Sequence, residues 1–347
     1  MSDTENVFLE VKDLMVQYTS AGEVIHAVNG VSFSLERGKT LALVGETGAG
    51  KTTIAKSILR ILPDHAAKIS GGSIFLEGKD LLQLSIPEMR KVRGARIAMV
   101  FQDPMTALNP NMKIGDQIAE VIRIHNDLSK GEVRRRTIEM LQMVGITAER
   151  YNEYPHQFSG GMKQRVIIAM ALACNPELLL ADEPTTALDV TIQAQILDMM
   201  LDLRDKNNTA MILVTHDLGI VAEAADTVAV IYAGEIVEYG TQQELFDQPV
   251  HPYTKGLFGA IPDMNADVKR LANIEGLPPN PVNLPGGCCF APRCPLVSPE
   301  CENTKYPLSR ISENHFCGCC KAADAAQEPE TPAEAEGRSS PLEVKNA

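Results

Sequence analysis

A single glycine-rich segment constrains the fold of this chain more than any other feature. Its residues are Gly45, Glu46, Thr47, Gly48, Ala49, Gly50, Lys51 and Thr52. An apolar run, 41–44, precedes it, and the segment 54–59 follows it with a helix-like pattern. The spacing fits G-x-x-x-x-G-K-[ST], in which glycines let successive backbone N–H groups point at one phosphate. The pattern predicts Lys51 on the β- and γ-phosphates and the Thr52 hydroxyl on Mg²⁺; a plain strand-to-helix turn is the alternative.

Composition narrows the class of protein. The 347 residues correspond to roughly two to three domains, and the net charge of −13 disfavours a protein that coats nucleic acid. The first residues carry no basic segment followed by an apolar core, so no secretory signal is expected. The longest apolar run, 166–174, is far shorter than the roughly 20 residues that span a bilayer. We therefore expect a soluble chain, or one attached to a membrane only through a partner.

Two acidic residues follow a fully apolar segment. Residues 178–181 are Leu-Leu-Leu-Ala, and Asp182 and Glu183 come next. A buried strand that ends in carboxylates is where phosphate-loop enzymes handle Mg²⁺ and the attacking water. We expect Asp182 in the Mg²⁺ shell and Glu183 to orient or deprotonate the water. A pair of capping acids is the alternative.

Three further polar side chains lie where a ligand could approach a sheet. Gln102 follows the strand-like segment 95–101, and His216 follows the segment 210–215. Side chains just past the strand ends of an α/β sheet face the usual ligand crevice. An ordinary loop residue and a structural histidine are the alternatives. Tyr18 lies near the end of a β-rich segment, where it either stacks on adenine or is a half-buried strand residue.

A helical pattern over 112–144 interrupts the strands and predicts an inserted helical subdomain. Ser159, Gly160 and Gly161 come later and open a second helical segment, 163–174. Ser159 can cap that helix, and the two glycines allow an anion to approach its N-terminus. Ordinary capping is the alternative.

The composition changes near residue 240, where prolines begin to recur and the periodicity fades, which predicts a domain boundary. Seven of the eight cysteines lie between Cys288 and Cys320. In a chain without a secretion signal, such a cluster favours metal binding over disulfides. The segment 322–347 is poor in aromatic residues and rich in Ala, Glu and Pro, which predicts a disordered tail.

The order and spacing of these motifs resemble the ABC transporter ATPase cassette over roughly residues 7–240, and later motifs extend the resemblance to about 320. The implied fold is an α/β, ABC-type phosphate-loop ATPase with a β-rich N-terminal part. Its implied divisions are a cassette at 1–240 with a helical subdomain at about 103–172, a small Cys/Pro-rich extension at 241–321, and the tail.

The resemblance assigns the motifs in sequence order. They are the Walker A loop at 45–52, the Q-loop at Gln102, the signature at 158–162, Walker B at 178–183, the D-loop at 187–189 and the H-loop at His216. The signature reads FSGGM where LSGGQ is commonest, with its serine and glycines intact. Glu183 and His216 are both present, so an active ATPase is implied.

The resemblance also implies the site residues of a machine in which two cassettes pack head to tail around two ATP molecules. The implied ATP contacts are Tyr18, Gly45, Glu46, Thr47, Gly48, Ala49, Gly50, Lys51, Thr52, Thr53, Gln102 and Asp182, with Ser159, Gly160 and Gly161 acting on the ATP of the other subunit. The implied Mg²⁺ ligands are Thr52, Gln102 and Asp182. The implied catalytic residues are Glu183, His216, Lys51 and Gln102.

The C-terminal part resembles the oligopeptide/dipeptide/nickel importer ATPases, through the run 251–254 (HPYT) and the pattern at 287–295. This implies a peripheral subunit on the cytoplasmic face of the membrane that powers import of di- or oligopeptides. The implied partners are a second ATPase subunit, with a heterodimer favoured over a homodimer, two integral membrane permeases and an extracytoplasmic solute-binding protein, but no nucleic acid. The alternatives are import of nickel chelates or another small solute, a soluble ABC ATPase of repair or translation, and an exporter.

In members of that subfamily with four such cysteines, the thiols resemble an iron–sulfur site, expected as [4Fe-4S]. The implied ligands are Cys288, Cys294, Cys301 and Cys319. The fourth is ambiguous among Cys317, Cys319 and Cys320, and the spacing from His315 favours Cys319. Zinc and unmetallated thiols are the alternatives. Cys289 is an extra cysteine without an implied role.

Overall fold

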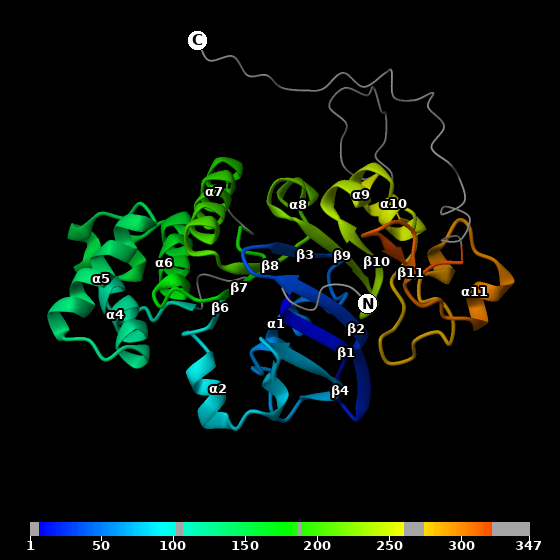
Figure 1. Cartoon of the computed structure of the whole chain (residues 1–347), viewed down its shortest axis with the longest axis horizontal. Coiled ribbons are helices and arrows are strands. Elements are labelled where there is room, and N and C mark those ends of the chain that lie inside the picture. Colours follow the sequence, from blue (N-terminus) through cyan, green and yellow to red (C-terminus); the bar gives the residue numbers. More distant parts are fainter. Residues whose placement is uncertain (1–6, 102–106, 186–188, 260–273, 321–347) are drawn as a thin grey trace, which may run out of the picture.

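The structure is a computed structural model of the chain, and it describes residues 7–101, 107–185, 189–259 and 274–320. The predicted Q-loop residue Gln102, the first two residues of the predicted D-loop and the predicted tail at 322–347 lie outside the described residues. Figure 1 shows two sheets at the centre, a group of helices at one end and a small C-terminal extension at the other.

The smaller sheet is antiparallel and confirms the predicted β-rich N-terminal part. Its strands run in the order β2-β1-β4-β5, with bounds β1 Val7–Ser20, β2 Glu23–Glu36, β4 Ala67–Leu76 and β5 Lys79–Asp80. Ala21 and Gly22 join β1 to β2 at φ angles of 51° and 84°, as a tight two-residue hairpin requires. The buried residues of β1, among them Leu9, Val11 and Leu14, face the hydrophobic core that this sheet shares with the larger one.

The larger sheet carries the strands on which the predicted site depends. Its order is β11-β12-β10-β9-β3-β8-β7-β6. The bounds are β3 Thr40–Val44, β6 Ile97–Val100, β7 Leu178–Asp182, β8 Ala210–Thr215, β9 Thr227–Tyr232, β10 Glu235–Thr241, β11 Ser309–Arg310 and β12 Phe316–Cys317. Strands β3, β7 and β8 are buried at every position, which explains their unbroken apolar runs. Because β3, β6, β7, β8 and β9 are parallel, their carboxyl ends meet at one edge of the sheet.

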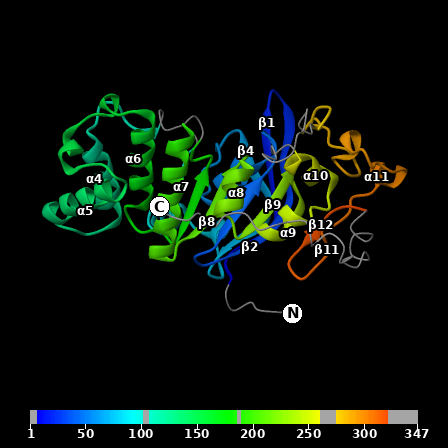
Figure 2. The same cartoon turned by 90° about the horizontal axis from the view of Figure 1, so that it is seen from above.

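Helices cover the larger sheet and extend beyond it (Figure 1). Their bounds are α1 Lys51–Ile58, α2 Ile86–Val92, α4 Ile114–His125, α5 Lys130–Met143, α6 Gly160–Leu172, α7 Val190–Asn207, α8 Leu218–Ala224, α9 Gln242–Asp247, α10 Pro252–Phe258 and α11 Pro299–Asn303. Helices α4, α5 and α6 gather at one end of the molecule in both views (Figure 2) and share a core with β6, β7 and β8. They fall within the segment 103–172, whose limits as a subdomain stay a prediction. No helix in the described ranges is both long and apolar enough to cross a membrane.

The C-terminal extension packs directly on the cassette. Strand β12 pairs with β10, with Cys317 opposite Glu238, so the extension continues the larger sheet. Tyr232 of β9 contacts two aromatic rings of the extension, Tyr253 and Phe290, with ring centroids 4.6 and 5.2 Å away. Cassette and extension therefore share one hydrophobic core beside β9.

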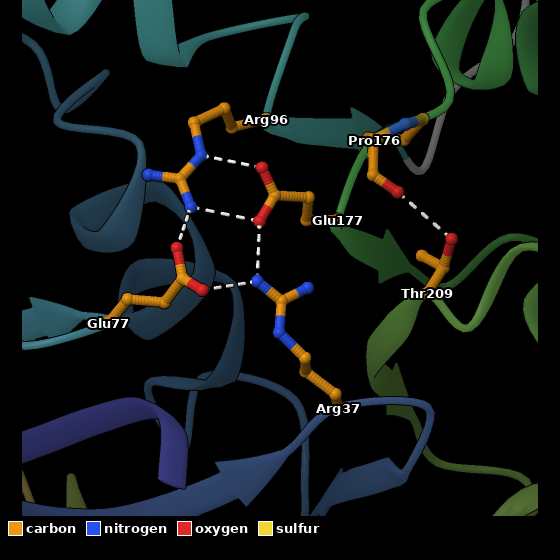
Figure 3. A network of polar contacts seen from close by, with 6 residues as sticks. All are labelled: Arg37, Glu77, Arg96, Pro176, Glu177 and Thr209. Carbon is orange, nitrogen blue, oxygen red and sulfur yellow. Dashed lines mark hydrogen bonds and ion pairs between the residues drawn. The ribbon is translucent and has the colours of Figure 1, made fainter. Parts of the chain in front are cut away.

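An ion-pair network connects the two sheets (Figure 3). Glu177, just before β7, accepts hydrogen bonds from Arg96 Nε at 2.6 Å and from Arg37 Nη2 at 2.9 Å. Glu77, in the turn after β4, pairs with the same two arginines. The hydrogen bond from Arg96 is the main cause that lowers the pKa of Glu177 to about 2. The network fixes the N-terminal end of β7, and the predicted carboxylates Asp182 and Glu183 lie at its C-terminal end.

Candidate nucleotide-binding site

The predicted phosphate loop connects β3 to α1, as the sequence pattern requires. Gly45 has a φ angle of 152°, and a Cβ atom there would lie 2.1 Å from the carbonyl oxygen of Ile231. Gly50 has a φ angle of 105°, and its Cβ would lie 2.4 Å from the carbonyl oxygen of Ala27. Both contacts are with backbone, so only glycine fits at these two positions.

Lys51, the first residue of α1, lies across the loop. Its Nζ donates to the carbonyl oxygens of Gly45 at 2.6 Å and Glu46 at 2.9 Å. Burial lowers the pKa of Lys51, and the charges of Glu183 and Asp182 partly oppose that shift. The ammonium group is therefore poorly solvated and surrounded by oxygen atoms, where further anionic oxygens would stabilise its charge.

Thr52 and Asp182 are two of the three predicted Mg²⁺ ligands, and they contact each other. The Thr52 Oγ1 hydroxyl donates a 2.8 Å hydrogen bond to Oδ1 of Asp182, the last residue of β7. Burial is the main cause that raises the pKa of Asp182. A hydroxyl and a buried carboxylate are hard oxygen donors, which suit Mg²⁺, and a cation would relieve the cost of desolvating the carboxylate. These residues therefore fit the ion.

Glu183 and His216 approach each other from two neighbouring strand ends. His216 Nδ1 lies 3.3 Å from Glu183 Oε1. Glu183 adopts a φ angle of 47°, unusual for a residue with a side chain, while its N–H donates to the carbonyl of Val214 in β8 at 2.8 Å. Such backbone strain concentrates at functional sites. The backbone conformation and the hydrogen bond fix the Cα and Cβ positions of Glu183 at the edge of the sheet.

The phosphate loop, Glu183 and His216 line one cavity of about 250 Å³. Its walls are Ala27, Thr47, Gly48, Gly50, Lys51, Thr52, Thr53, Glu183 and His216. The structure therefore brings the predicted loop, glutamate and histidine together.

Tyr18 lies at the margin of this site. Its Oη is 3.3 Å from Oγ1 of Thr53, the residue directly after the loop. The ring is partly buried against the core beneath the smaller sheet. Its position beside α1 is compatible with the predicted stacking on adenine, which stays a prediction.

The predicted signature residues lie at the start of α6. The Ser159 hydroxyl accepts a 3.4 Å hydrogen bond from the N–H of Met162, so the predicted helix cap is confirmed. A Cβ on Gly160 would meet open space, and one on Gly161 would lie 2.9 Å from Ile192 Cγ2. Among the residues that line the 250 Å³ cavity, none belongs to this segment. Their predicted action on the ATP of another subunit stays a prediction.

Gln164 was missed by the sequence reasoning. It is 1% exposed, and its Nε2 donates a 2.6 Å hydrogen bond to the carbonyl oxygen of Pro184, the residue after Glu183. It thus connects α6 to the segment that carries Glu183, the predicted catalytic residue. The signal available in the sequence is one amide within an apolar helix, two residues after the signature.

The cysteines of the extension separate into two groups. Five of them line a small pocket together with Phe290 and Ala291: Cys288, Cys294, Cys301, Cys319 and Cys320. Two others are buried elsewhere. Cys317 faces the core within β12, and burial raises its pKa strongly. Burial also raises the pKa of Cys289, to about 11. Neither thiol lines the pocket.

The pocket has five thiols, and an iron–sulfur cluster uses four. Cys301 Sγ lies 3.6 Å from Cys320 Sγ, a contact that the spacing argument for Cys319 did not anticipate. Across the described part of the chain, no three His, Cys, Asp or Glu side chains converge to hold a single metal ion. Each thiolate of a four-iron cluster binds a different iron, so its ligands surround a volume and need not converge on one point.

Comparison with known protein families supports the predicted ABC cassette and the predicted C-terminal extension. The family model of the ABC transporter matches residues 28–186. The model described as "Oligopeptide/dipeptide transporter, C-terminal region" matches residues 237–301.

Similar proteins agree with these matches. The chain is 50% identical to the dipeptide transport ATP-binding protein DppD of Bacillus subtilis, over 90% of this chain and 93% of that protein. It is 45% identical to the oligopeptide transport ATP-binding protein OppD of Salmonella typhimurium, over 92% and 95%. A dimeric ATP-binding cassette, MJ0796, solved with ADP and phosphate, superposes with a TM-score of 0.62 at 27% identity, over 67% of this chain and 98% of that one. The chain therefore belongs to the ABC transporter family, among the ATP-binding proteins of oligopeptide and dipeptide transporters.

Proposed function

We propose that this chain is the ATP-hydrolysing, energy-coupling subunit of a binding-protein-dependent importer of di- and oligopeptides. The observation that carries the ATPase part is the convergence of Lys51, Glu183 and His216 on the cavity next to the Thr52–Asp182 pair. The peptide part rests on likeness over both the cassette and the extension to relatives named for dipeptide and oligopeptide transport.

The geometry supports a mechanism of positioning and charge stabilisation. The N–H groups of the loop and Lys51 would bind the β- and γ-phosphates, and Thr52 and Asp182 would hold Mg²⁺, which would neutralise developing charge on the phosphate oxygens. Glu183 accepts a proton from a water molecule. The water oxygen then bonds to the γ-phosphorus while the bond to the bridging oxygen breaks, which leaves ADP and phosphate.

His216 orients this reaction. Its Nδ1 is 3.3 Å from the Glu183 carboxylate, so the imidazole fixes the direction of the base and leaves its other nitrogen for the γ-phosphate. The side chain is 62% exposed, which allows it to face a second cassette. Ser159, Gly160 and Gly161 of that cassette would complete the γ-phosphate site, so ATP would favour the closed pair and hydrolysis the open one.

The proposed assembly places this subunit on the cytoplasmic face of the membrane. Two such ATPases, a heterodimer by preference, would bind two membrane permeases, and an extracytoplasmic solute-binding protein would deliver the peptide. Gln102 would serve as a Mg²⁺ ligand and as the relay to the permeases. The relation of the chain to MJ0796, solved as a dimer, supports the pairing of cassettes.

The test is transport by the complete complex in proteoliposomes. Labelled di- and oligopeptides should enter only with ATP inside the compartment that holds this subunit. Glu183→Gln should slow both hydrolysis and uptake by about 100-fold or more. Uptake of nickel chelates without peptide uptake would replace the peptide assignment and keep the ATPase. ATP hydrolysis that drives neither would refute the transport role.

We also propose that the pocket thiols hold a [4Fe-4S] cluster through Cys288, Cys294, Cys301 and a fourth cysteine. Cys319 is the expected fourth ligand, because the 3.6 Å contact between the Cys320 and Cys301 thiols is too short for two thiolates that bind different irons of one cluster. Iron, sulfide and zinc should be measured on anaerobically purified protein, with absorbance in the sulfur-to-iron charge-transfer region. Cys319→Ser should lose more iron than Cys320→Ser; equal retention of iron in both variants, or zinc in place of iron, would contradict this assignment.

A further inference from the structure

Glu46, the second residue of the phosphate loop, is bound by a residue 247 positions further along the chain. Arg293 Nη1 donates to Glu46 Oε2 at 2.9 Å, and Nη2 donates to Oε1 at 3.0 Å. This is a bidentate pair, the strongest common form of an ion pair. The Arg293 side chain is 5% exposed and that of Glu46 is 29% exposed, so solvent screens the pair only partly.

The guanidinium group of Arg293 is held in place by further contacts. Its Nε donates to the carbonyl oxygen of Glu275 at 3.0 Å, and its Nη2 also donates to that of Ile274 at 3.2 Å. Nη1 lies 3.2 Å from the hydroxyl oxygen of Tyr232 in β9. The hydrogen bond with Glu46 is the main cause that raises the pKa of Arg293. These contacts therefore fix the orientation of the Arg293 guanidinium group independently of its ion pair with Glu46.

A second residue of the extension binds the backbone at the same position. The Tyr253 Oη accepts a 2.9 Å hydrogen bond from the N–H of Glu46. Tyr253 is fully buried, and its ring packs against those of Tyr232 and Phe290 at centroid distances of 4.6 and 5.5 Å. The hydroxyl can move little, because the ring that carries it is fully buried and packs against two other rings.

The carbonyl oxygen of Glu46 also takes part in a hydrogen bond. It accepts the 2.9 Å hydrogen bond from Lys51 Nζ, the group that is expected to bind the terminal phosphates. Glu46 is therefore held through its N–H by Tyr253 and through its carboxylate by Arg293, while its carbonyl meets the lysine. A shift of Glu46 would move both the curve of the loop and the lysine.

We propose that Arg293 and Tyr253 are positioning residues of the ATP site. They act through Glu46, and they hold the phosphate loop in the shape that binds the phosphates of ATP. The C-terminal extension thus contributes to nucleotide affinity without touching the nucleotide. The inference needs only the ATPase activity and is independent of the transported solute.

The test is ATP binding and hydrolysis by the full chain with Mg²⁺, and by the assembled transporter. Arg293→Met should raise the Kd of a fluorescent ATP analogue and the KM for ATP roughly tenfold, while kcat at saturating ATP stays within about twofold. Arg293→Lys should restore part of the affinity, since it keeps the charge and loses the bidentate geometry. Tyr253→Phe keeps the ring and removes one oxygen, so it remains informative if Arg293→Met does not fold.

A double-mutant cycle separates positioning from general stability. Glu46→Gln combined with Arg293→Met should bind ATP about as well as either single variant, because both remove the same contact. Lys305→Met is the matched control. It breaks another ion pair between extension and cassette, with Glu235, and should leave ATP affinity unchanged.

Three results would overturn the inference. They are wild-type ATP affinity in a folded Arg293→Met variant, losses that add in the double variant, and an equal loss in Lys305→Met. The expected loss of ATP affinity in Arg293→Met, found in a complex that transports no peptide, would instead refute the proposed substrate and keep the positioning role.

Discussion

The hydroxyl of Thr52 donates a 2.8 Å hydrogen bond to the carboxylate of Asp182, although 130 positions separate the two residues in the sequence. The pair exists because β3 and β7 are both parallel neighbours of β8 and end at the same edge of the sheet. The hydrogen bond joins the end of β7 to the start of α1, so the two proposed Mg²⁺ ligands lie side by side without any ion.

Removal of this pair should abolish the effect of Mg²⁺ on nucleotide binding. Thr52→Ala and Asp182→Asn should each lower the ATPase rate by about 100-fold or more, because the charge on the phosphates is no longer neutralised. Isothermal titration with ATP, with and without Mg²⁺, measures the effect. A variant that still gains affinity from Mg²⁺ to the wild-type extent would show that other ligands hold the ion.

Glu183→Gln should separate ATP binding from hydrolysis. Glutamine keeps the size of the side chain and cannot take a proton from water, so the rate should fall by about 100- to 10,000-fold while ATP still binds. Size-exclusion chromatography in MgATP should then show stable pairs of subunits, provided the membrane partners or the second ATPase are present. Absence of any ATP-dependent pairing would contradict the proposed closed dimer.

His216→Ala should lower hydrolysis and spare ATP affinity. The imidazole contacts the Glu183 carboxylate, so its removal leaves Lys51 and the contacts of the loop with the phosphates intact, and only the proposed contact of His216 with the γ-phosphate is lost. We expect a fall in kcat of about 100-fold with a KM within about threefold of wild type. An increase in KM with unchanged kcat would assign His216 to nucleotide binding instead.

Tyr18 offers a test of adenine recognition. Tyr18→Phe keeps the ring and loses only the 3.3 Å contact with Thr53, so ATP affinity should stay near wild type. Tyr18→Ala should cost about 1–3 kcal/mol of binding, the usual contribution of stacking between a base and an aromatic ring. Fluorescence titration with an ATP analogue distinguishes the two variants; equal losses in both would mean that the hydroxyl matters and stacking does not.

The Arg37–Glu77–Arg96–Glu177 network of Figure 3 should make the free energy of unfolding depend on pH in the acid range. The pKa of Glu177 is lowered from 4.5 to about 2 in the fold, so the unfolded chain takes up the proton first. The stabilisation is complete above pH 4.5 and is lost as pH falls from there towards 2. Allowing for solvent screening, we expect Glu177→Gln to cost about 1–2 kcal/mol at pH 7.

Urea unfolding at pH 7 and at acid pH measures this effect. Glu139→Gln, which breaks the exposed pair with Arg135 on α5, is the matched control and should change stability by less than about 0.5 kcal/mol. A Glu177→Gln variant whose deficit is the same at pH 7 and at pH 3 would show that its cost does not come from the ion pairs.

The sequence was sufficient for the part of the site that lies at strand ends. Residues 178–181 are apolar because β7 is covered on both faces, and a polar residue directly after such a strand must emerge at the ligand edge. Asp182, Glu183 and His216 were predicted on that ground. The loop was predicted because only glycine can adopt the backbone of Gly45 and Gly50.

The contacts that the sequence did not reveal depend on packing over long separations. No local pattern relates Glu46 to Tyr253 or Arg293, since the core around Tyr232 brings them together. Spacing alone could not choose between Cys319 and Cys320 either, because the choice depends on how the turn after β12 directs each thiol. Gln102 lies outside the described residues, and its role stays a prediction.

The pairing of β12 with β10 has a practical consequence for anyone who shortens this protein. A chain cut at residue 240, where the composition changes, would lose β11 and β12 and leave one side of β10 with its backbone N–H and C=O groups bare. Such an exposed margin readily recruits strands from other molecules. A cassette that ends at residue 240 would therefore be prone to aggregation. The extension must be kept if the protein is to be handled at high concentration.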